Sequence, residues 1–394
     1  MAIIYIGSIY PPFMIEELKA MNSSIDYAAE TFQSSLINGI SSFCKELKII
    51  TAPNVSTYPK IKKVRFDKIN FQYDGLDGYH VFTGFINLPI LKHISKAIRV
   101  LKAIYQMSDP YIENKIIVYG VHSPFLLPLL ALKKNIKVCL IVPDLPEFMS
   151  GRNSKLFLLA KKIDRWLINV CLRRVDSYVL FSPHMKEKLP IKEQPWLHLE
   201  GILNTNNIIE NTYPKESEKI ILYTGNLSAR MGIKNLLDAF ALIPFSNYRL
   251  WIRGAGDCKK IVLDASKSDS RIIYWDHMTK EELLVLLKRA TILINPVFSS
   301  QEFTRYFFPS KTMEYLASGT PTVMSRLPCI PSEYDKYLFY FDEESIDGIK
   351  NKIIDICERK QEELEAFGKA AAEFVIREKN EIKQAGKILK LLNI

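Results

Sequence analysis

The sequence from residue 308 to residue 321 carries a cation and a carboxylate at a spacing suited to a nucleotide site. Lys311 and Glu314 are three residues apart, so on a helix they share one face. Ser310 suits the start of that helix and Gly319 suits its end. The amides at the helix start and Lys311 would favour a diphosphate, and Glu314 could accept hydrogen bonds from two vicinal hydroxyls of a sugar. An exposed Lys–Glu pair on a surface helix would give the same pattern.

Two glycine-containing turns follow predicted strands upstream of this segment. The sequence GNLSARMG contains Gly225, Asn226 and Arg230, and its guanidinium could hold a phosphate while the glycines let backbone amides approach. Ligands of open α/β sheets bind beyond the carboxyl ends of strands. Gly254 and Gly256 match part of a dinucleotide fingerprint, but its third glycine and its ribose-binding acid are missing. We therefore expect them to form a tight turn close to a nucleotide base. A glycine turn with a solvated Arg230 is the alternative.

The first half of the chain offers two candidates at predicted strand ends. His122 follows the strand at 115–119, and Asp144 occupies the next such loop together with Glu147. These side chains could bind an acceptor or serve as a base. A structural histidine and an aspartate that caps a helix are equally compatible with the pattern. We find no His/Cys metal cluster, no Gly-x-Ser-x-Gly nucleophile turn and no Walker-type phosphate loop in the sequence.

Length and composition predict a soluble protein of two domains. The chain has 394 residues, 48% hydrophobic and 24% charged, and contains no apolar run as long as a bilayer span. Residues 1–7 predict a first strand rather than a signal peptide. The six cysteines are scattered, without any pair at metal-ligand spacing, which favours a cytosolic chain with reduced thiols.

The positive charge lies almost entirely in the first half. Residues 1–200 hold 26 Lys+Arg and 17 Asp+Glu, whereas residues 201–394 hold 27 and 26. This asymmetry predicts an anionic partner: a membrane surface, a phosphorylated lipid or a nucleic acid. The sequence lacks a motif of exposed aromatics among basic residues, so we expect no nucleic acid.

Two predicted helices, 91–106 and 155–174, combine apolar stripes with basic residues. In the first, Leu91, Ile94, Ile98 and Tyr105 share the stripe with Leu101, and the neighbouring face carries four basic residues. Either helix could lie on an anionic membrane. Ordinary helices that face the protein core have the same pattern.

Alternating strand-like and helix-like segments predict two successive β/α series. The predicted strands are 3–7, 47–51, 115–119, 136–142 and 177–182, then 219–224, 248–253, 271–274, 291–295, 320–324 and 338–341. The predicted helices are 25–46, 91–106 and 155–174, then 234–241, 280–289 and 310–318, followed by a helical tail from 345 to 394. Residues 201–218 lack periodicity and predict a linker. The fold class is therefore α/β, with two Rossmann-like domains facing a central cleft.

The second half resembles the nucleotide-binding domain of retaining GT-B glycosyltransferases, in particular family 4, also called group 1. Three segments carry the resemblance in the right order: 225–232, 250–256, and 295 through Phe-Pro-Ser-Lys to 321. By this resemblance Glu314 is the second acid of the family's paired-glutamate motif and holds the donor ribose. The first acid of that motif is Tyr306 here. Arg230 lies next to the family's diphosphate-binding lysine, which is Met231.

Further positions follow from the same resemblance. The family's arginine before that lysine is Asn226, and Lys311 replaces part of the lost positive charge. His122 corresponds to a histidine that contacts the transferred sugar. The resemblance also implies an N-terminal acceptor-binding domain at 1–205 and a C-terminal nucleotide-sugar domain at 206–375. A C-terminal helix at 376–394 would pack back towards the N-terminal domain.

The resemblance implies a cytoplasmic enzyme, peripheral on the inner face of the cell membrane. It would move a sugar from a nucleotide diphosphate sugar to a lipid-linked or growing polysaccharide acceptor, with retention and without metal or other cofactor. His122, Asp144, Arg230 and Lys311 would serve catalysis. Gly225, Asn226, Arg230, Gly254, Gly256, Ser310, Lys311 and Glu314 would bind the donor. A GT-B scaffold that lost catalysis and acts as a partner subunit is the first alternative, and a dinucleotide-dependent enzyme is the second.

Overall fold

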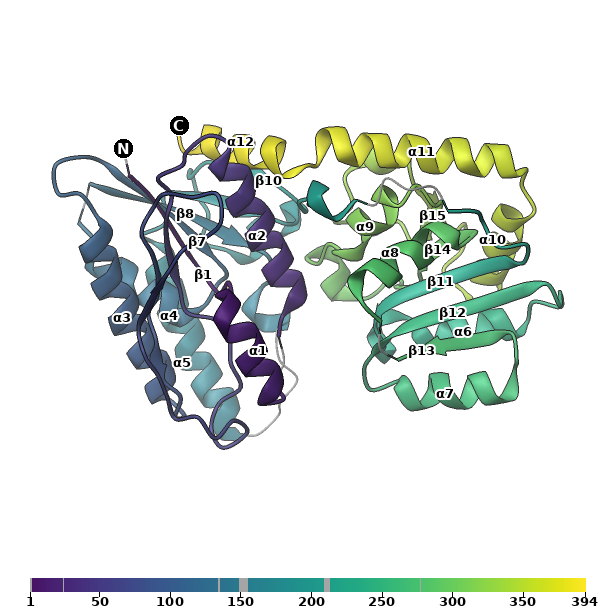
Figure 1. Ribbon diagram of the computed structural model, residues 1–394, viewed down its shortest axis with the longest axis horizontal. Helices are drawn as coiled ribbons and strands as arrows, with labels where there is room; N and C mark the ends of the chain where they lie inside the picture. The colour runs from purple at the N-terminus through teal and green to yellow at the C-terminus, as the bar shows by residue number, and fades with distance from the viewer. Residues whose placement is uncertain (1, 24, 134, 149–154, 209–212, 277) are drawn as a thin grey trace. The chain divides into compact units, whose positions relative to one another are not determined.

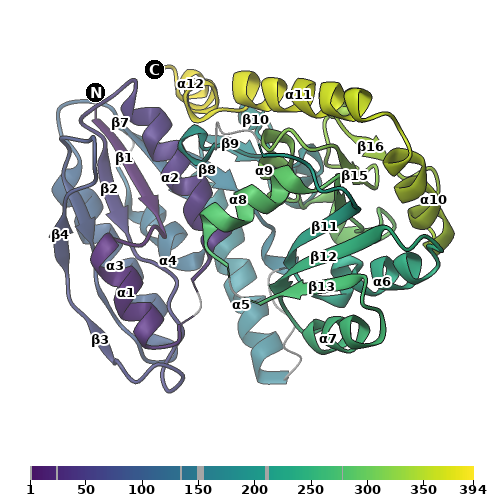
Figure 2. The same ribbon diagram turned by 45° about the vertical axis from the view of Figure 1, so that its right-hand side comes forward.

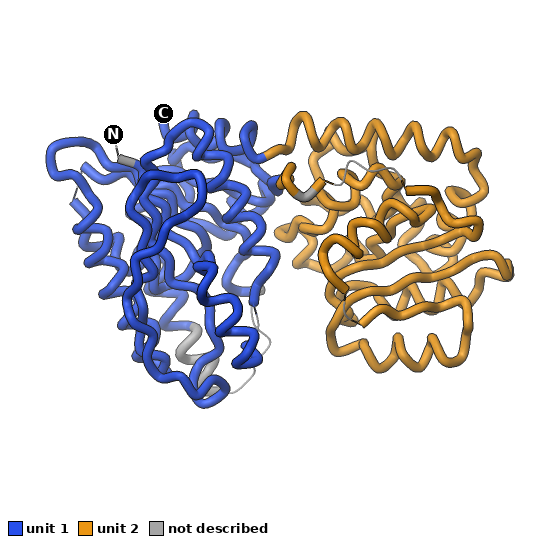
Figure 3. The backbone as a smooth tube through the Cα atoms, in the orientation of Figure 1, with its two compact units in different colours: residues 1–202, 381–394 blue, residues 203–380 orange. Residues whose placement is uncertain are grey.

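The chain forms two compact units, which Figure 3 shows in different colours. The computed structural model describes residues 2–23, 25–133, 135–148, 155–208, 213–276 and 278–394. Unit 1 comprises Met1–Ile202 and Glu381–Ile394, and unit 2 comprises Leu203–Asn380. The domain boundaries predicted at 205/206 and 375/376 lie three and five residues from these divisions of the chain.

Unit 1 is built on an eight-stranded sheet of order β10-β9-β8-β7-β1-β2-β5-β4, in which only β4 runs antiparallel to its neighbour. A short antiparallel pair, β3 and β6, lies apart from it. The strands are β1 Ala2–Gly7, β2 Lys48–Thr51, β3 Arg65–Phe66, β4 Ile69–Phe71, β5 His80–Phe82, β6 Phe85–Ile86, β7 Asn114–Tyr119, β8 Ile136–Val142, β9 Ser177–Leu180 and β10 Trp196–His198.

Helices cover both faces of this sheet (Figure 1). One face packs on α2 and α12, whose side chains share a buried cluster with alternate residues of β1, β7 and β8. The other face carries α3, α4 and α5, which contact one another directly or through the 3-10 turn η1. The helical elements of unit 1 are α1 Pro12–Ala20, α2 Tyr27–Ser41, α3 Leu91–Met107, α4 Ser123–Leu126, η1 Leu127–Ala131, η2 Pro146–Phe148, α5 Lys155–Leu172, η3 Pro183–Lys188 and α12 Glu381–Leu391.

Helix α3 is partly inverted relative to an ordinary core-facing helix: it buries Val100, Ile104 and Met107, but two lysines are buried beside them. Lys92 and Lys96 are buried, with only 7% and 3% of their surface exposed, while the apolar stripe of the same helix faces outward. Lys96 Nζ donates hydrogen bonds to the carbonyl oxygens of Ala52 (2.9 Å) and Pro53 (2.6 Å), at the end of β2. Lys92 Nζ donates to the carbonyl oxygen of Val55. The core-facing interpretation of the α3 stripe is therefore wrong, because the lysines must face inward to bind these carbonyls.

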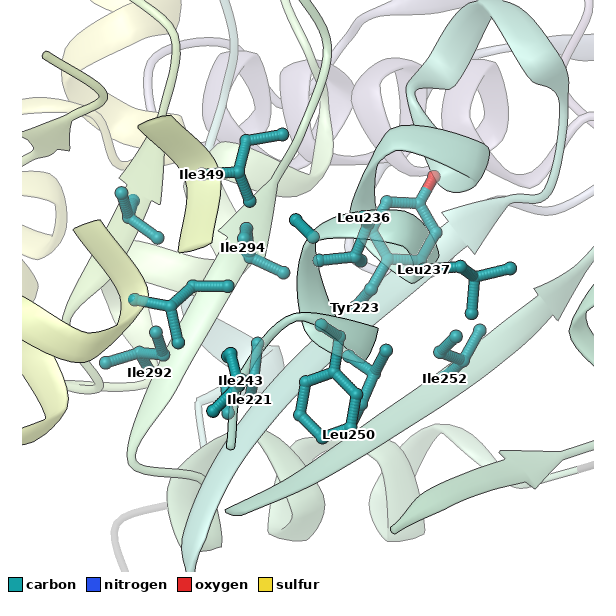
Figure 4. Close-up of a cluster of buried hydrophobic side chains, with 14 of the residues drawn as sticks. Ile221, Tyr223, Leu236, Leu237, Ile243, Leu250, Ile252, Ile292, Ile294 and Ile349 are labelled. Atoms are coloured by element: carbon teal, nitrogen blue, oxygen red, sulfur yellow. The ribbon is translucent and has the colours of Figure 1, made fainter. Parts of the chain in front are cut away.

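Unit 2 is built on a six-stranded, fully parallel sheet of order β13-β12-β11-β14-β15-β16. Alternate residues of β11 face two different cores. Ile221 and Tyr223 join the cluster drawn in Figure 4, whereas Ile220 and Leu222 pack under α8 and α9. Burial on both faces explains why this strand reads as a nearly continuous apolar run. The strands are β11 Lys219–Asn226, β12 Tyr248–Ala255, β13 Ile272–Trp275, β14 Ile292–Asn295, β15 Thr322–Met324 and β16 Phe339–Tyr340.

The helices of unit 2 lie in two layers, with α6 and α7 on one face of the sheet and α8 and α9 on the other (Figure 2). The helical elements are η4 Thr205–Asn207, η5 Ala229–Met231, α6 Ile233–Ala241, α7 Lys259–Ser268, α8 Lys280–Arg289, η6 Glu302–Arg305, α9 Lys311–Ala317, η7 Ser332–Tyr334, α10 Ile346–Cys357 and α11 Gln361–Glu378.

The predicted linker at 201–218 is attached to unit 2 wherever the structure describes it beyond residue 202. Leu203 is buried in a cluster of this unit and bridges to Asn380. Lys215 Nζ donates hydrogen bonds to Ala290 O (2.7 Å) and Thr320 Oγ1 (2.8 Å). The division between the two units thus falls near the start of the predicted linker, and its described residues from 203 onwards are held by unit 2.

The two β/α series are confirmed as an α/β fold with parallel sheets. Every predicted strand and helix exists, with ends shifted by a few residues. The sequence interpretation missed α1, α7, β10 and the short strands β3 to β6. Among the described residues, no helix is long and apolar enough to cross a membrane.

Candidate functional site at the carboxyl edge of the unit 2 sheet

The strand order of unit 2 reverses between β11 and β14. From β11 the chain proceeds through β12 to β13 on one side, and β14 then returns to the opposite side of β11. Parallel sheets bind ligands at such a switch point, beyond the carboxyl ends of the two central strands. Here those ends are Gly225 and Asn226 on β11 and Asn295 on β14. Helix α9 begins at Lys311 and packs on the face of the sheet that also carries α8.

Lys311 reaches from the first residue of α9 to the end of β11. Its Nζ donates a hydrogen bond to the Thr224 carbonyl oxygen (3.2 Å) and lies 3.8 Å from the ring centroid of Tyr223. The side chain has no carboxylate partner in the described part of the chain. Burial lowers the pKa of Lys311 well below its usual range, because one carbonyl hydrogen bond and an aromatic ring do not replace the hydration that the charged form loses. An anion bound at this point would restore that stabilisation.

Gly225 lies directly beside the Lys311 side chain and has φ +129°. A Cβ added to Gly225 would meet only the side chains of Lys311 and Tyr223, at 3.7 Å and beyond. Gly254 is different, because its added Cβ would lie 1.8 Å from the Gly225 carbonyl oxygen. Gly256 faces the carbonyl oxygen of Leu227 in the same way, at 2.3 Å. Two of the predicted donor-binding glycines therefore let the ends of β11 and β12 pack together, and Gly225 leaves room next to a cation.

Glu314 lies one turn after Lys311 and is half-buried. Burial raises the pKa of its carboxyl, while the positive charges of Lys280 and Arg253 oppose that rise. No hydrogen bond or ion pair of the Glu314 side chain is present in the described part of the chain. Arg253, at the end of β12, has a buried Nε without a hydrogen-bond partner there. Carboxylate and guanidinium thus keep hydrogen-bonding capacity available at the strand ends.

Asn295 adds a second unpartnered polar group at the switch point. Its side chain is 1% exposed, and neither its amide oxygen nor its amide nitrogen has a hydrogen-bond partner among the described residues. Leu222 and Leu293 pack with Tyr315 in one cluster, and residues two apart on a strand share a face. Asn295 therefore lies on the same face of the sheet as Thr224, which receives the hydrogen bond from Lys311. Unpartnered buried amides are rare in proteins and mark places where a ligand or water completes the set.

Arg230 lies on η5, in the turn that follows β11. The side chain is exposed, and its guanidinium carbon lies 5.5 Å from the ring centroid of Phe303. Gln301 Nε2 donates a hydrogen bond to the Arg230 carbonyl oxygen (3.0 Å). Gly232 ends the turn with φ +76°. A Cβ added to Gly232 would lie only 2.0 Å from the Pro296 carbonyl oxygen, so a larger residue would clash there. The structure thus places Arg230 near the switch point without a direct contact to Lys311 or Glu314.

Ser310 and Tyr306, two positions of the motif around α9, do not have the roles that the family motif implies. Ser310 occupies the N-cap of α9 and is exposed, but its hydroxyl makes no capping hydrogen bond. Tyr306, at the place of the family's first acid, is only 4% exposed. A carboxylate substituted there would be buried, so this chain uses the position for packing.

In unit 1, the predicted residue His122 is held in place by the surrounding backbone. It is the N-cap of α4, at the end of β7, and its ring packs against Gly120, whose added Cβ would lie 2.7 Å from the ring Cδ2. Burial and the nearby charge of Lys96 lower its pKa to about 4. The imidazole is therefore neutral at physiological pH and can donate or accept one hydrogen bond at each nitrogen.

Asp144 and a residue not predicted from the sequence, Glu30, complete the carboxyl edge of unit 1. Asp144 is exposed in the loop after β8. Glu30, in the first turn of α2, accepts hydrogen bonds from the Tyr10 amide (2.9 Å) and the Ser34 hydroxyl (3.2 Å), and burial raises its pKa to about 7. The sequence signal was the acid pair Asp26 and Glu30 at a helix start, where Asp26 caps α2.

The arrangement at the edge of unit 2 suits an anion attached to a polyhydroxylated group. It supplies an uncompensated half-buried ammonium, a half-buried carboxylate and an unpartnered amide within one switch point. Arg253 and Asn295 were missed as candidates, although a charged or amide side chain in the last three residues of a buried strand was a usable signal. No group of three His, Cys, Asp or Glu side chains that could hold a metal ion occurs among the described residues.

Comparison with known protein families finds a similarity that is confined to unit 2. The model of the family described as glycosyl transferases group 1 matches residues 204–374. No curated protein matches the chain in a sequence search.

Solved structures resemble the whole chain at low sequence identity. Sucrose-phosphate synthase from Thermosynechococcus elongatus has a TM-score of 0.67 and 14% identity, covering 100% of this chain and 98% of that one. Anabaena HepE in complex with UDP has a TM-score of 0.67 and 11% identity, covering 100% of both chains. The catalytic domain of starch synthase IV from Arabidopsis thaliana, bound to ADP and acarbose, has 0.66 and 8%, covering 99% and 98%. At these identities the likeness shows the fold, which is GT-B.

Proposed function

We propose that this protein transfers a sugar from a nucleotide diphosphate sugar bound at the switch point of unit 2, because the model of the family described as glycosyl transferases group 1 matches residues 204–374. The single observation that carries the proposal is Lys311. Its ammonium lies at the end of β11, next to Gly225, with no carboxylate partner in the described part of the chain. A diphosphate is the part of such a donor that this charge would bind.

The remaining groups fit the rest of a donor. Glu314 would accept hydrogen bonds from the ribose hydroxyls. The positive charge of Arg253, on β12, would favour the ionised form of the Glu314 carboxyl. Asn295 would bind a donor oxygen through an amide that has no protein partner. Gly254 and Gly256 bring β12 close enough to β11 for the base to lie along their turn.

Catalysis would consist mainly of stabilising the leaving group. When the bond from the anomeric carbon to the diphosphate oxygen breaks, negative charge grows on the diphosphate. Lys311 and Arg230 would carry the opposite charge there. The acceptor hydroxyl would then attack the oxocarbenium-like sugar on the face that the diphosphate leaves, with retention and without a metal ion. His122, being neutral, would donate a hydrogen bond to the sugar rather than a charge.

The acceptor would be a lipid-linked or growing polysaccharide, bound at the carboxyl edge of the unit 1 sheet near Asp144. We place the protein in the cytoplasm, on the inner face of the cell membrane. The excess of Lys and Arg in residues 1–200 supports an anionic surface as its partner. The resemblance of the fold to polysaccharide-forming and sucrose-forming synthases is compatible with a glycan acceptor.

The proposal is tested by release of nucleoside diphosphate from a panel of UDP-, ADP-, GDP- and dTDP-sugars without added acceptor. Water can replace the acceptor hydroxyl as the nucleophile, so a working site should cleave at least one sugar nucleotide slowly. Lys311→Met should abolish that release. Lys350→Met, which changes an exposed helix of the same unit, should leave it unchanged. Absence of cleavage of every donor by the wild-type protein would contradict the proposal.

A second candidate function rests on the losses in the family motif. The family's first acid is a buried tyrosine, Tyr306, and its diphosphate-binding lysine is Met231. These losses favour a GT-B scaffold that binds nucleotide and acts as a partner subunit. Tight binding of a nucleoside diphosphate without any donor cleavage would support that scaffold and exclude the enzyme.

A further inference from the structure

A long loop of unit 2 joins two residues of the candidate site. Residues 296–310 run from Asn295, at the end of β14, to Lys311, at the start of α9. Within this loop, all of which the structure describes, the 3-10 turn η6 is the one regular element. Loops of this length are uncommon in compact domains unless they have a function. The conformation of the loop therefore depends on hydrogen bonds made by side chains.

The half-buried carboxylate of Glu344 holds this loop from outside it. Both of its oxygens accept from the Ser299 amide, each at 2.9 Å, and a hydrogen bond to a charged acceptor is stronger than one between neutral groups. Glu344 lies in the turn between β16 and α10, and this turn is closely fitted. Ser345 caps α10 by accepting from the Gly348 amide (2.9 Å), and a Cβ added to Gly348 would lie 2.0 Å from the Glu343 carbonyl oxygen. The carboxylate is thus presented from a well-packed part of the unit, as an anchor for a loop requires.

Further hydrogen bonds connect this anchor to Arg230. The hydroxyl of Thr304, which is fully buried, lies within hydrogen-bond distance of the carbonyl oxygens of Ser299 (3.0 Å) and Gln301 (2.6 Å). Gln301 Nε2 in turn donates to the Arg230 carbonyl oxygen (3.0 Å). The ring centroid of Phe303 lies 5.5 Å from the guanidinium carbon of Arg230. The segment that Glu344 anchors therefore contacts both the backbone and the side chain of Arg230.

We propose that Glu344 is a positioning residue for the donor site: it anchors residues 299–304, and these orient Arg230 towards the diphosphate of the donor. The inference rests on the proposed function, because that function assigns Arg230 to the diphosphate. Arg230 is exposed and would otherwise sample many rotamers. Holding its side chain before the donor arrives lowers the conformational entropy that is lost on binding. Glu344 acts through the loop alone, since a carboxylate beside a diphosphate would oppose binding.

The test is a double-mutant cycle of Glu344→Ala and Arg230→Ala, measured by calorimetric titration with UDP, ADP, GDP and dTDP and with their nucleosides. Glu344→Ala should weaken binding of the diphosphate about three- to tenfold, because it can lose no more than Arg230 itself contributes. In the Arg230→Ala background the same change should have less than about a twofold effect, since the residue through which it acts is gone. Nucleoside binding should not change in any of these variants.

Two controls separate positioning from stability and from charge. Glu344→Gln removes the charge but keeps an oxygen that can accept from Ser299, so its affinity should stay within about twofold of the wild type. Glu358→Ala removes the hydrogen bond from the Tyr248 hydroxyl (2.7 Å) at the other end of α10. This variant should lower the melting temperature and leave the affinity for the diphosphate unchanged.

Hydrogen exchange without any ligand measures the anchor itself. Glu344→Ala should speed the exchange of amides 299–306, and Glu358→Ala should not. Unchanged exchange in Glu344→Ala would overturn the inference. Equal weakening by Glu344→Ala with and without Arg230 would also overturn it and leave the proposed donor site intact. A wild-type protein that binds none of the four diphosphates would overturn the proposed function, and this inference with it.

Discussion

Replacing Lys311 by methionine should separate nucleotide binding from stability. Methionine keeps an unbranched apolar chain against Tyr223 and Tyr315 but removes the ammonium. A charge-assisted hydrogen bond contributes about 1.5–3 kcal/mol, so the dissociation constant of the nucleoside diphosphate should rise about 10- to 150-fold. The parent nucleoside, which lacks the diphosphate, should bind almost unchanged. Isothermal titration with both ligands measures the difference.

The same variant should not lose stability. Burial lowers the pKa of Lys311, which means that the folded protein holds the charge at a cost. Methionine removes this cost and forfeits the hydrogen bond to Thr224, worth about 0.5–1.5 kcal/mol, so the free energy of unfolding should change by no more than about 1 kcal/mol. A large fall in stability, or equal losses of affinity for the nucleoside and its diphosphate, would show that Lys311 acts through folding and would refute the argument.

Protonation supplies a further check on Lys311. A bound diphosphate raises the lowered pKa again, so binding should take up protons, and affinity should fall as pH rises through the pKa of Lys311 in the free protein. Titration in buffers of different ionisation enthalpy measures this uptake. Lys311→Arg keeps the charge at every accessible pH and should abolish the uptake while it preserves binding.

Five other changes have defined outcomes. Glu314→Gln should weaken donor binding about tenfold or more, and unchanged affinity with unchanged turnover would remove its ribose role. Arg230→Ala should weaken the diphosphate far more than the nucleoside, as titration with both would show. Gly254→Ala should lower the free energy of unfolding by about 3 kcal/mol or more, because the new Cβ meets a carbonyl oxygen at 1.8 Å; Gly319→Ala, with φ +75° but open space, should cost about 1 kcal/mol. Glu30→Gln should stabilise the protein by about 1–3 kcal/mol at pH 8. The Glu30 carboxyl has a pKa of about 7 in the folded protein and 4.5 in the unfolded chain, so the wild type loses stability as the pH rises from 4.5 to 7. Denaturation curves of wild type and variant should therefore coincide below pH 4.5 and separate above it.

Sequence periodicity predicted the parallel strands well because both faces of each sheet are buried. In such strands almost every residue is apolar, and a run like 219–223 has few other interpretations. The short strands β3 to β6 were missed since they contain only two or three residues each, too few for any period. Helix α7 was missed because its sequence is mostly polar and buries only Val262 completely.

The inversion of α3 could not be predicted from its own pattern. An apolar stripe beside a basic face favours a core-facing helix until one knows where the carbonyls of residues 52, 53 and 55 lie. Those carbonyls belong to a segment that is distant in the sequence, and they accept hydrogen bonds from Lys92 and Lys96. Helical period alone does not encode such long-range hydrogen bonds, so the outcome depends on tertiary structure.

The sequence predicted several residues of the candidate site, but it did not predict most of the contacts that these residues make. Lys311 and Gly225 lie together as a switch point requires, although 86 residues separate them in the sequence. Gly254 has a packing role that spacing did not reveal, because it depends on how closely β11 approaches. Arg253 and Asn295 emerged only when unpartnered buried atoms could be identified.

The central claim, that the switch point of unit 2 binds the diphosphate of a sugar nucleotide, is tested most directly by calorimetric titration with UDP, ADP, GDP and dTDP and their nucleosides. The account predicts that at least one diphosphate binds with unit stoichiometry, at least tenfold more tightly than its nucleoside, and that Lys311→Met removes this difference. Failure of all four diphosphates to bind the folded protein, or tight binding that Lys311→Met leaves intact, would contradict it.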